Sequence, residues 1–413
     1  MKPAISKDVL KFKNTKSPVR EIMDLANPQY FKQVGLDPAE VISFSGGWVN
    51  HAAPEDLRDA YTQIIHDPDR FHASGAYPPT IGAPECRQAL VDFEKHLYGE
   101  DMELTPDNIA IGCNSSQMTF NLMHILLDPG DKILLLDPAY CNYPSQVSSI
   151  DGVETIRFPV LDTEQWCYVA NERIDAFAEF IHKEKPKMIL LCAPDNPTSQ
   201  ILSTEFVKAA LTAAQEVGSF LVIDFAYKAL VWDDNTPEYF SWGPNDNFIS
   251  IHSNSKWCRG LGRRLGWIEA PIEIVEAFEA VQGSSILCPD TLHQMALTDY
   301  IGSGISNDSI KPYIRQTAEL YKKAALRTVE AIETHLKLPC LVPQGGLYTV
   351  VRVDEKSSDF SRKILENTGV IVVPGWGFGD TLQQAVRLSF GPLVHNLNKI
   401  DEAMQRIGSF LKS

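Results

Sequence analysis

Residues 187–224 read KMILLCAPDNPTSQILSTEFVKAALTAAQEVGSFLVID and contain the unit on which the predicted architecture rests. Two short apolar runs, residues 187–193 and 220–224, have the length and the β-branched content of buried strands. Between them, residues 204–217 have apolar side chains at the spacing of an amphipathic helix. Because a strand, a helix and a second strand in this order form a parallel pair, the run predicts an α/β fold.

The same alternation extends in both directions along the chain. Further strands are predicted at residues 109–111, 132–136, 248–252 and 265–269, and a helix at residues 117–127. The pattern indicates a mostly parallel sheet with helices on both faces, and ligands of such sheets bind at the carboxyl ends of the strands. Polar residues follow the strands at that edge: Asn114, Ser115, Tyr140, Asn196, Asp224, Ser253 and Lys256.

After about residue 310 the pattern changes. A long charged helix is predicted at residues 311–336, short strands at 346–353 and 370–373, and a closing helix at 396–411. These elements indicate a smaller α+β domain. Residues 41–55, which contain a Gly46-Gly47 turn, are expected to lie with it and to leave a cleft. The predicted division is a large domain at residues 56–305 and a small domain formed by residues 1–55 and 306–413.

Composition excludes several classes of function. The 413 residues hold 37 Lys and Arg against 53 Asp and Glu, a formal net charge of −16, whereas nucleic acid binding needs a basic surface. No apolar run approaches a membrane span and the start of the chain lacks a leader pattern, so a cytoplasmic protein without nucleic acid or membrane partners is expected. The 8 cysteines form no CxxC pair and no zinc-type cluster, which predicts free thiols and no metal site.

The strongest chemical signal is the SNSK run that ends at Lys256, between a predicted strand and the Gly- and Arg-rich residues 257–266. A lysine amine that is desolvated there has a lowered pKa and can act as a nucleophile. Ser253, Ser255 and Arg264 supply hydroxyls and a guanidinium that can hold a phosphate. Taken alone, the motif is equally compatible with a solvated lysine in a turn.

Two other strand ends have both a structural and a chemical interpretation. Asp224, followed by Tyr227, is either a helix N-cap or a buried carboxylate that pairs with a cation such as a protonated pyridine nitrogen. Asn196, in the DNPT run of residues 195–198, belongs either to an Asx turn or to a donor set for a phenolate oxygen. The chemical interpretation is favoured for both because Lys256 accompanies them.

Residues 112–117 (GCNSSQ) lie between a predicted strand and a predicted helix. Backbone amides at a helix start, together with two hydroxyls, form an anion site, although an ordinary capped helix has the same sequence. The candidate phosphate ligands in this run are Asn114, Ser115, Ser116 and Gln117. Tyr140 comes just after the next strand, where its ring either stacks on a flat heterocycle or packs in the core.

Together these motifs resemble the fold-type I pyridoxal 5′-phosphate (PLP) enzymes, and among them the class I/II aminotransferases related to aspartate and aromatic aminotransferases. The resemblance covers residues 18–410, with the motifs in the family's order and approximate spacing. It implies a large domain with a mostly parallel seven-stranded sheet between helices, a smaller α+β domain, and PLP as the cofactor.

The resemblance also implies roles for the candidate residues around the cofactor. Lys256 matches the Schiff-base lysine, and Asp224 matches the partner of the pyridine nitrogen. Asn196 and Tyr227 match the two donors to the 3′ oxygen of the cofactor. Arg264 matches the phosphate arginine, residues 114–117 match the phosphate turn, and Tyr140 matches the aromatic residue that stacks on the ring.

Further matches concern the substrate and a second subunit. Arg387 matches the arginine that binds the α-carboxylate of the substrate, with Asn196 expected beside it. Gly47 lies at the glycine of the family's gating segment, and Trp48 brings a bulky ring to the place where substrate enters. Tyr77 matches the tyrosine that reaches the cofactor phosphate of the neighbouring subunit, which implies a homodimer with shared active sites.

The implied reaction is that of an aminotransferase. PLP, held as an internal aldimine at Lys256, accepts the amino group of an α-amino acid and leaves a 2-oxo acid and pyridoxamine phosphate. Lys256 is expected to act as the general base, Asp224 to keep the pyridine nitrogen protonated, and Tyr227 to stabilise the phenolate. These three are the predicted catalytic residues.

The chain also departs from the family pattern. Ser115 and Ser199 stand where the family usually has glycine, which predicts altered backbone at the phosphate turn and beside the ring. Trp48 and His51 replace a smaller gate, and His51 is predicted to be a polar surface residue. Residues 283–291 hold no arginine, which argues against aspartate or glutamate as the principal amino donor.

Fold and cofactor do not fix the reaction. Lyases and substitution enzymes acting at the β- or γ-carbon, ring-forming synthases and oxygen-dependent amino-acid oxidases share these residues and remain alternatives to an aminotransferase. A PLP-sensing transcription regulator is disfavoured, because only about 40 residues precede the gating segment and the net charge is −16.

Overall fold

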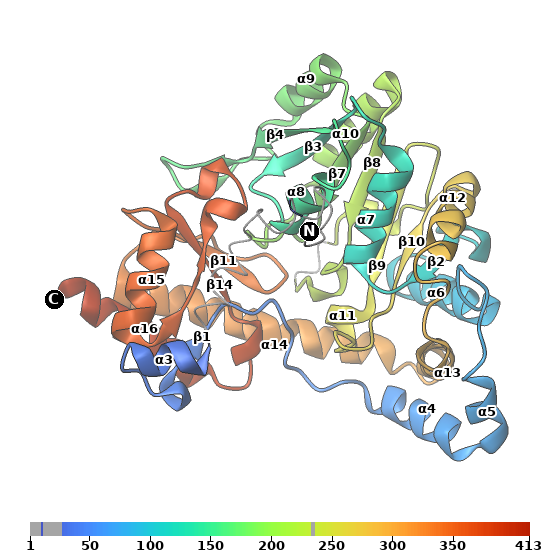
Figure 1. Cartoon of the computed structure of the whole chain (residues 1–413), viewed down its shortest axis with the longest axis horizontal. Helices are drawn as coiled ribbons and strands as arrows, with labels where there is room; N and C mark the ends of the chain where they lie inside the picture. Colours follow the sequence, from blue (N-terminus) through green and yellow to red (C-terminus); the bar gives the residue numbers. More distant parts are fainter. Residues whose placement is uncertain (1–9, 11–26, 233–235) are drawn as a thin grey trace, which may run out of the picture.

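The computed structural model describes residue 10, residues 27–232 and residues 236–413. The predictions made for residues 1–9 and 11–26, which include the start of the small domain and the expected lack of a leader segment, lie outside the described residues. Figure 1 shows the helices and strands along the chain.

The predicted mostly parallel sheet of seven strands is confirmed, in the order β2-β10-β9-β8-β7-β3-β4. The strands are β2 (Ile109–Gly112), β3 (Lys132–Asp137), β4 (Glu154–Pro159), β7 (Met188–Cys192), β8 (Phe220–Asp224), β9 (Phe248–Ser253) and β10 (Gly266–Glu269). Strand β10 runs antiparallel to both of its neighbours, and all the other neighbouring pairs are parallel. Strand β4, at the edge, was not predicted.

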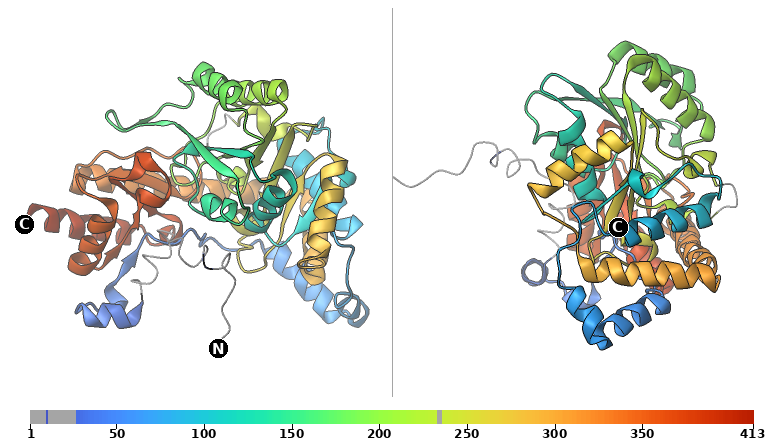
Figure 2. Two further views of the ribbon diagram at one scale, coloured as in Figure 1. Left: turned by 45° about the horizontal axis from the view of Figure 1, so that its top comes forward. Right: turned by 90° about the vertical axis from the view of Figure 1, so that its right-hand side faces the viewer.

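Helices cover both faces of this sheet (Figure 2) because its strands are apolar on both sides. Successive residues of β7 illustrate this: Ile189 packs in a core with α9 and α10, and Leu190 packs in another with α7, α8 and α12. The helices of this part are α4 (Glu55–His66), α5 (Pro68–Ala73), α6 (Pro84–Tyr98), α7 (Ser115–Leu126), α8 (Asn142–Val147), α9 (Ile174–Glu184), α10 (Thr204–Val217), α11 (Asn254–Trp257), α12 (Ile272–Gly283) and α13 (Thr291–Ser306).

The C-terminal part contains a three-stranded sheet, β11-β14-β13, and a short parallel pair, β1-β12. Its elements are β1 (Ile42–Ser43), β11 (Tyr348–Arg352), β12 (Val370–Ile371), β13 (Val373–Pro374), β14 (Ala385–Ser389), α3 (Pro28–Gln33), α15 (Ser357–Thr368) and α16 (Leu397–Lys412). The pairing of Ile42 with Val370 brings a segment before residue 55 against the C-terminal segment, as predicted. The domain boundaries at residues 55/56 and 305/306 stay predictions.

Helix α14 (Ile310–Ala331) connects the two parts, and in Figure 1 it runs from beside α13 to α16. A π-helical turn, Ile332–Leu336, continues it, so the helix predicted at residues 311–336 is confirmed. Among the described residues, no helix combines the length and the apolar character needed to cross a membrane.

Candidate functional site

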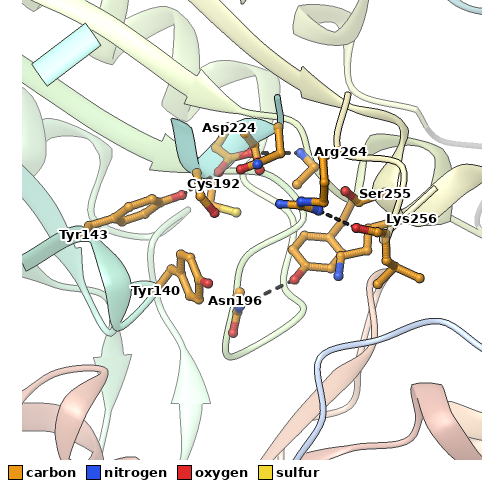
Figure 3. Close-up of a pocket in the computed structure, with 14 residues that line it drawn as sticks. Tyr140, Tyr143, Cys192, Asn196, Asp224, Ser255, Lys256 and Arg264 are labelled. Carbon is orange, nitrogen blue, oxygen red and sulfur yellow. Dashed lines mark hydrogen bonds between the residues drawn. The ribbon is translucent and has the colours of Figure 1, made fainter. Parts of the chain in front are cut away.

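A cavity of about 210 Å³ lies at the carboxyl ends of β2, β7, β8 and β9 (Figure 3). Most of the residues predicted to bind the cofactor line it, namely Asn114, Ser115, Ser116, Tyr140, Asn196, Asp224, Tyr227, Ser255, Lys256 and Arg264. Four lining residues had no predicted role: Tyr143, Cys192, Ala226 and Leu261. The parallel strands bring these segments together because their ends meet at one edge of the sheet.

Lys256 reaches the cavity from α11, the short helix that follows β9. Its Nζ atom donates a hydrogen bond to the carbonyl oxygen of Gly47 at 2.5 Å. Burial, helped by the positive charges of Arg264 and Arg387, lowers the pKa of Lys256 to about 8, while Asp224 opposes the shift. At neutral pH a much larger fraction of this amine is therefore neutral, the nucleophilic form, than of an ordinary lysine amine with its pKa of 10.5.

Asp224, the last residue of β8, is buried beside this lysine. One carboxylate oxygen accepts a hydrogen bond from the backbone N–H of Ala226, and the other accepts one from the Tyr143 hydroxyl, both at 3.0 Å. Burial raises the pKa of the carboxyl group, and these donors together with the charges of Lys256 and a nearby histidine act against that rise. A cation placed in the cavity would stabilise the charged form further.

Two donors come from the ends of neighbouring strands. The Asn196 amide Nδ2 donates to the Tyr227 hydroxyl at 3.5 Å. The Asx turn, the structural alternative for this run, is present as well: Asp195 accepts hydrogen bonds from the backbone N–H and the hydroxyl of Thr198, at 3.2 and 2.5 Å. The turn and the chemical interpretation are therefore compatible, because the turn presents Asn196 to the cavity. The hydroxyl of Tyr348, on β11, lies 2.8 Å from that of Tyr227 and was missed because its strand is distant in sequence.

The other end of the cavity is built to bind an anion. The Asn114 side chain accepts the backbone N–H of Gln117 at 3.1 Å and caps α7, and Ser115 and Ser116 lie on the first turn of that helix. Ser255 and Arg264 line the same cavity. A helix N-terminus combined with hydroxyls and a guanidinium is a typical phosphate site.

Three of the predicted cofactor residues do not line the cavity: Tyr77, which is exposed, and Gln117 and Ser253, whose side chains bond within the protein. The Gln117 side chain accepts the Cys113 backbone N–H at 2.8 Å and donates to Gln282 at 3.2 Å. The Ser253 hydroxyl accepts the backbone N–H of Ser255 at 3.1 Å and donates to the Ser255 hydroxyl at 2.8 Å. Both side chains therefore hold the backbone of the phosphate end in place.

Arg387, on β14, is 2% exposed and lies beside the cavity. Its guanidinium donates to Oδ1 of Asn196 and to the carbonyl oxygen of Ser45, both at 3.0 Å, and lies 4.3 Å from the centroid of the Tyr348 ring. Within the described part of the chain its Nε atom has no hydrogen-bond partner. A buried cation with an unused donor is suited to bind a carboxylate.

The gating segment contacts the site through its backbone. A Cβ atom added at Gly47 would lie 2.5 Å from the Tyr348 hydroxyl, so any side chain there would have to displace the Tyr348 ring. Trp48 is 45% exposed and Tyr77 is 84% exposed, and neither lines the cavity. Tyr77 is thus free to contact another molecule.

The prediction that His51 is a surface residue is wrong. Its ring is buried, with Nδ1 2.9 Å from the Tyr321 hydroxyl and Nε2 3.2 Å from the carbonyl oxygen of Trp257. Burial lowers the pKa of His51 to about 4, so the ring is neutral near neutral pH. His51 therefore ties the gating segment to α14 and to the end of α11.

The two serines at family glycine positions behave differently. Ser115 begins α7 and has right-handed helical backbone, so no left-handed conformation is needed there. Ser199 has φ +55°, in the left-handed region where a side chain is unfavourable. Its hydroxyl accepts the backbone N–H of Tyr348 at 3.0 Å, a bond that glycine could not make.

The donor set of the cavity fits PLP. A buried carboxylate faces the cavity for the pyridine nitrogen, and the anion end suits the phosphate. An amide and a phenol suit the 3′ oxygen, and an amine with a lowered pKa suits the aldehyde carbon. These four requirements are met in one cavity by residues from separate strands.

Comparisons with known proteins agree with this geometry. The family described as aminotransferase class I and II matches residues 39–407. The aspartate/prephenate aminotransferase of Thermus thermophilus is 26% identical over 376 residues, which cover 89% of this chain and 91% of the relative. The valine–pyruvate aminotransferase of Mycobacterium tuberculosis is 26% identical over 404 residues, covering 94% and 97%.

Solved structures show the same fold. The aspartate aminotransferase of Thermus thermophilus with maleate has a TM-score of 0.81 at 23% identity, covering 98% of this chain and 100% of that structure. The aromatic aminotransferase of Pyrococcus horikoshii has a TM-score of 0.80 at 21% identity, covering 95% and 98%.

Proposed function

Because the chain belongs to the class I and II aminotransferase family, whose members use PLP, we propose that it is an α-amino-acid aminotransferase. It transfers the amino group of an amino acid to the cofactor, which releases a 2-oxo acid and leaves pyridoxamine phosphate. PLP supplies an aldehyde that receives the amino group and a ring that accepts electrons from the substrate Cα. The observation that carries the proposal is a lysine amine of lowered pKa facing a buried aspartate in one cavity.

Lys256 provides the amine that holds the cofactor and the base that moves the proton. Its pKa of about 8 allows it to take a proton from the substrate Cα near neutral pH and to give it back at the cofactor carbon. The Gly47 carbonyl, 2.5 Å from Nζ, holds the free amine toward the gating segment. Substrate that enters past this segment therefore meets the amine directly.

Asp224, Asn196 and Tyr227 tune the cofactor. Asp224 would pair with the protonated pyridine nitrogen. The hydrogen bonds from Ala226 and Tyr143 fix its two oxygens. Asn196 and Tyr227 donate to the 3′ oxygen, which stabilises its negative charge. Tyr140, which lines the same cavity, would stack its ring on the cofactor.

The phosphate is held by the N-terminus of α7 with Ser115 and Ser116, and by Ser255 and Arg264. Asn114, Gln117 and Ser253 shape this end of the cavity by capping the two helices and fixing the loop between β2 and α7. The exposed Tyr77 completes the site of a second subunit, so we propose a homodimer with shared active sites. A cytoplasmic location stays a prediction.

Arg387 binds the α-carboxylate of the substrate. Asn196, bonded to one of its nitrogens, holds the guanidinium at the cavity, and the unused Nε hydrogen is available to the carboxylate. Gly47 leaves room for the substrate at the Tyr348 hydroxyl, and Trp48 forms the outer side of the entrance. The reactive Cα is then fixed relative to Lys256.

The test is to load the purified chain with PLP, exclude oxygen, add single amino acids and follow the visible absorbance of the cofactor with product analysis. We expect stoichiometric conversion to pyridoxamine phosphate and an equal amount of 2-oxo acid. Release of ammonia, return of the original spectrum after each turnover, or a coloured species that waits for oxygen would instead indicate a lyase, a synthase or an oxidase.

A matched pair of variants tests the phosphate site. Arg264 lines the cavity, whereas the neighbouring Arg263 does not and lies 4.4 Å from the centroid of the Tyr61 ring. Arg264→Gln is expected to weaken PLP binding about tenfold or more, because a charge-assisted phosphate contact is lost. Arg263→Gln should bind PLP like the wild type; equal losses in both variants would contradict the assignment.

A further inference from the structure

Tyr348 is a buried tyrosine to which the sequence analysis gave no role, and its hydroxyl meets that of Tyr227. It is the first residue of β11 and is 1% exposed. The two hydroxyl oxygens are 2.8 Å apart, and the rings meet edge to face with their centroids 5.7 Å apart. The contact therefore joins the three-stranded sheet to the segment after β8 that carries a predicted cofactor ligand.

The side chain of Tyr348 is fixed by the residues around it. Its backbone N–H donates to the Ser199 hydroxyl at 3.0 Å, and its ring lies 4.3 Å from the guanidinium carbon of Arg387. On the side of the gating segment, Gly47 leaves so little space that an added Cβ atom would lie 2.5 Å from the Tyr348 hydroxyl. The hydroxyl is therefore held against Tyr227.

The direction of the hydrogen bond between the two tyrosines matters for the cofactor. A tyrosine hydroxyl has one hydrogen to donate and can accept others on its oxygen. Among the described residues, Tyr227 is the hydrogen-bond partner of the Tyr348 hydroxyl, and the Tyr227 oxygen also faces the Asn196 Nδ2 donor at 3.5 Å. When Tyr348 donates, the hydrogen of Tyr227 stays free for an acceptor in the cavity. The 3′ oxygen of PLP is such an acceptor.

Both hydroxyls keep their hydrogens near neutral pH, because burial raises the pKa of Tyr227 and of Tyr348. The charge of Arg387 opposes this rise at Tyr348, which makes its hydroxyl a better donor. The other titratable groups around the pair are Cys141, Cys192, Tyr140 and Lys256. Hydrogen bonds in a chain polarise one another, so a Tyr227 hydroxyl that accepts from Tyr348 donates more strongly itself.

We propose that Tyr348 is a positioning residue that donates to the Tyr227 oxygen and thereby directs the Tyr227 hydrogen to the 3′ oxygen of the cofactor. The inference rests on the proposed function for the role of Tyr227. Tyr348 itself acts through its neighbour, and its ring beside Arg387 links the same residue to the group that binds the substrate carboxylate.

The first test reads the bound cofactor in the absence of amino acid. Tyr348→Phe keeps the ring and removes only the hydroxyl. With PLP loaded, the pH midpoint of its visible absorbance should lie roughly 0.5 to 1 pH unit above that of the wild type. The reason is that a weaker donor leaves the 3′ oxygen more basic, so the bound cofactor keeps its proton to higher pH.

Tyr239→Phe is the matched control. Tyr239 is equally buried, and its hydroxyl donates to the carbonyl oxygen of Leu202 at 3.0 Å, away from the cavity. This variant should titrate like the wild type. A Tyr348→Phe protein with an unchanged midpoint, or equal shifts in the two variants, would overturn the proposal.

A double-variant cycle tests whether Tyr348 acts through Tyr227. Tyr227→Phe removes the direct donor and should raise the midpoint more than Tyr348→Phe does. In the Tyr227→Phe background, the additional change Tyr348→Phe should shift the midpoint no further. A shift of the same size with and without the Tyr227 hydroxyl would mean that Tyr348 acts through Arg387 or through the fold, which contradicts the proposal.

Turnover gives an independent readout once a reacting amino acid is known. Tyr348→Phe should lower kcat by roughly three- to tenfold with little change in KM, because the ring beside Arg387 is kept. A higher KM with unchanged kcat would contradict a role at the cofactor. If the wild type releases ammonia or waits for oxygen, the aminotransferase proposal fails, whereas the absorbance midpoints still decide the role of Tyr348.

Discussion

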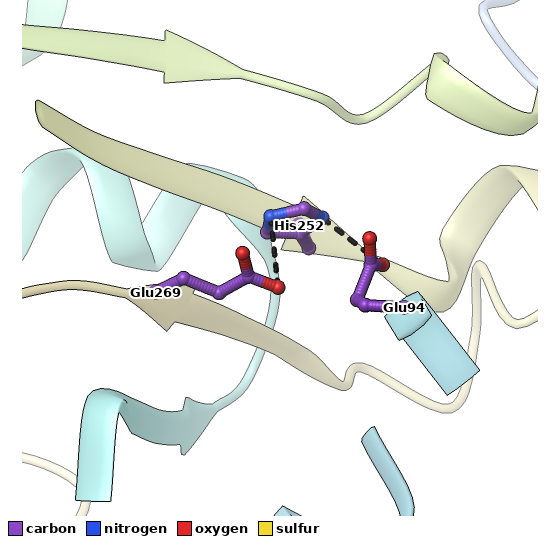
Figure 4. Close-up of side chains that lie close together, drawn as sticks. All are labelled: Glu94, His252 and Glu269. Carbon is purple, nitrogen blue, oxygen red and sulfur yellow. Dashed lines mark ion pairs between the residues drawn. The ribbon is translucent and has the colours of Figure 1, made fainter. Parts of the chain in front are cut away.

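The cofactor cavity and a second group of side chains lie at the same end of the sheet but differ in how their charges are matched. We call the second group the charge cluster; it consists of Glu94 on α6, Lys228 in the 3-10 turn Lys228–Leu230, His252 on β9 and Glu269 on β10 (Figure 4). In the cavity, Asp224 accepts hydrogen bonds from neutral donors and Lys256 donates to a carbonyl, and neither forms an ion pair among the described residues. In the cluster, the Lys228 ammonium lies 2.6 Å from a carboxylate oxygen of Glu94, and the His252 imidazole lies 3.5 and 3.3 Å from carboxylate oxygens of Glu94 and Glu269. Unmatched charge in the cavity shifts pKa values and awaits a ligand, whereas matched charge stabilises the fold.

The largest expected effect separates Lys256 in the cavity from Lys228 in the charge cluster by activity. Lys256→Ala should lower turnover on the order of 10⁴-fold or more, because it removes both the amine that holds the cofactor and the base. PLP can still bind through its phosphate, which an absorbance titration would show. Lys228→Met, in the cluster, should keep turnover within about tenfold of wild type where the protein is folded. A Lys256→Ala enzyme that remained active would contradict the catalytic role of Lys256 and its difference from Lys228.

The free energy of unfolding should separate the same two lysines in the opposite direction, because the Lys228 variant is the one expected to lose stability. Lys228→Met leaves Glu94 buried without its ammonium partner, and removal of one member of a buried pair costs about 3–5 kcal/mol. Lys256→Met removes no ion pair, so the apo protein should be at least as stable as wild type. Denaturant unfolding of both apo variants measures this. If both variants lost the same free energy of unfolding, Lys256 and Lys228 would not differ in ion pairing as described.

Much of the fold could be predicted from the sequence because the central strands are short apolar runs bounded by polar residues. The runs that became β7, β8 and β9 are buried on both faces, and periodicity detects this pattern. Edge strand β4 was missed because its side chains are half exposed and include charges. Strand β14 was missed because Arg387 interrupts its apolar run.

The site was predictable only where residues follow strands directly. Lys256, Asp224 and Asn196 are positioned by their own strands, so local sequence carries the signal. Tyr348 reaches the cavity from a distant sheet, and the charge cluster joins four elements, so neither has a local pattern. His51 was wrongly placed because its burial depends on Tyr321, which is 270 positions away along the chain.

The unmatched amine also predicts how the stability of the apo protein changes with pH. Folding lowers the pKa of Lys256 from 10.5 to about 8, so between these values the unfolded chain binds a proton that the folded chain does not. The free energy of unfolding therefore rises with pH across that window, by up to about 3 kcal/mol. Below pH 8 the folded chain keeps the desolvated ammonium, which lowers the free energy of unfolding by its full amount.

Lys256→Met isolates this contribution from other groups that titrate at alkaline pH. Denaturant unfolding of the apo forms should show the variant more stable than wild type at pH 7.5, with the difference shrinking toward pH 10.5. Lys228→Met should show no such convergence with the wild type, because both proteins keep Lys256 and its lowered pKa. If the free energy of unfolding of the wild type ran parallel to that of Lys256→Met across this pH range, the lowered pKa of Lys256 would be contradicted.

The smallest expected effect concerns Ser199, which links the cavity loop to β11. Its left-handed backbone costs roughly 1 kcal/mol relative to glycine, and its hydroxyl offsets this by accepting the Tyr348 N–H at 3.0 Å. Ser199→Gly relieves the backbone but loses the bond, so its unfolding free energy should lie within about 1 kcal/mol of wild type. Ser199→Ala keeps the strain and loses the bond, and should be less stable than the glycine variant by roughly 1 kcal/mol. Denaturant midpoints of the three proteins give the order; an alanine variant as stable as the wild type would show that the hydroxyl does not compensate the strain.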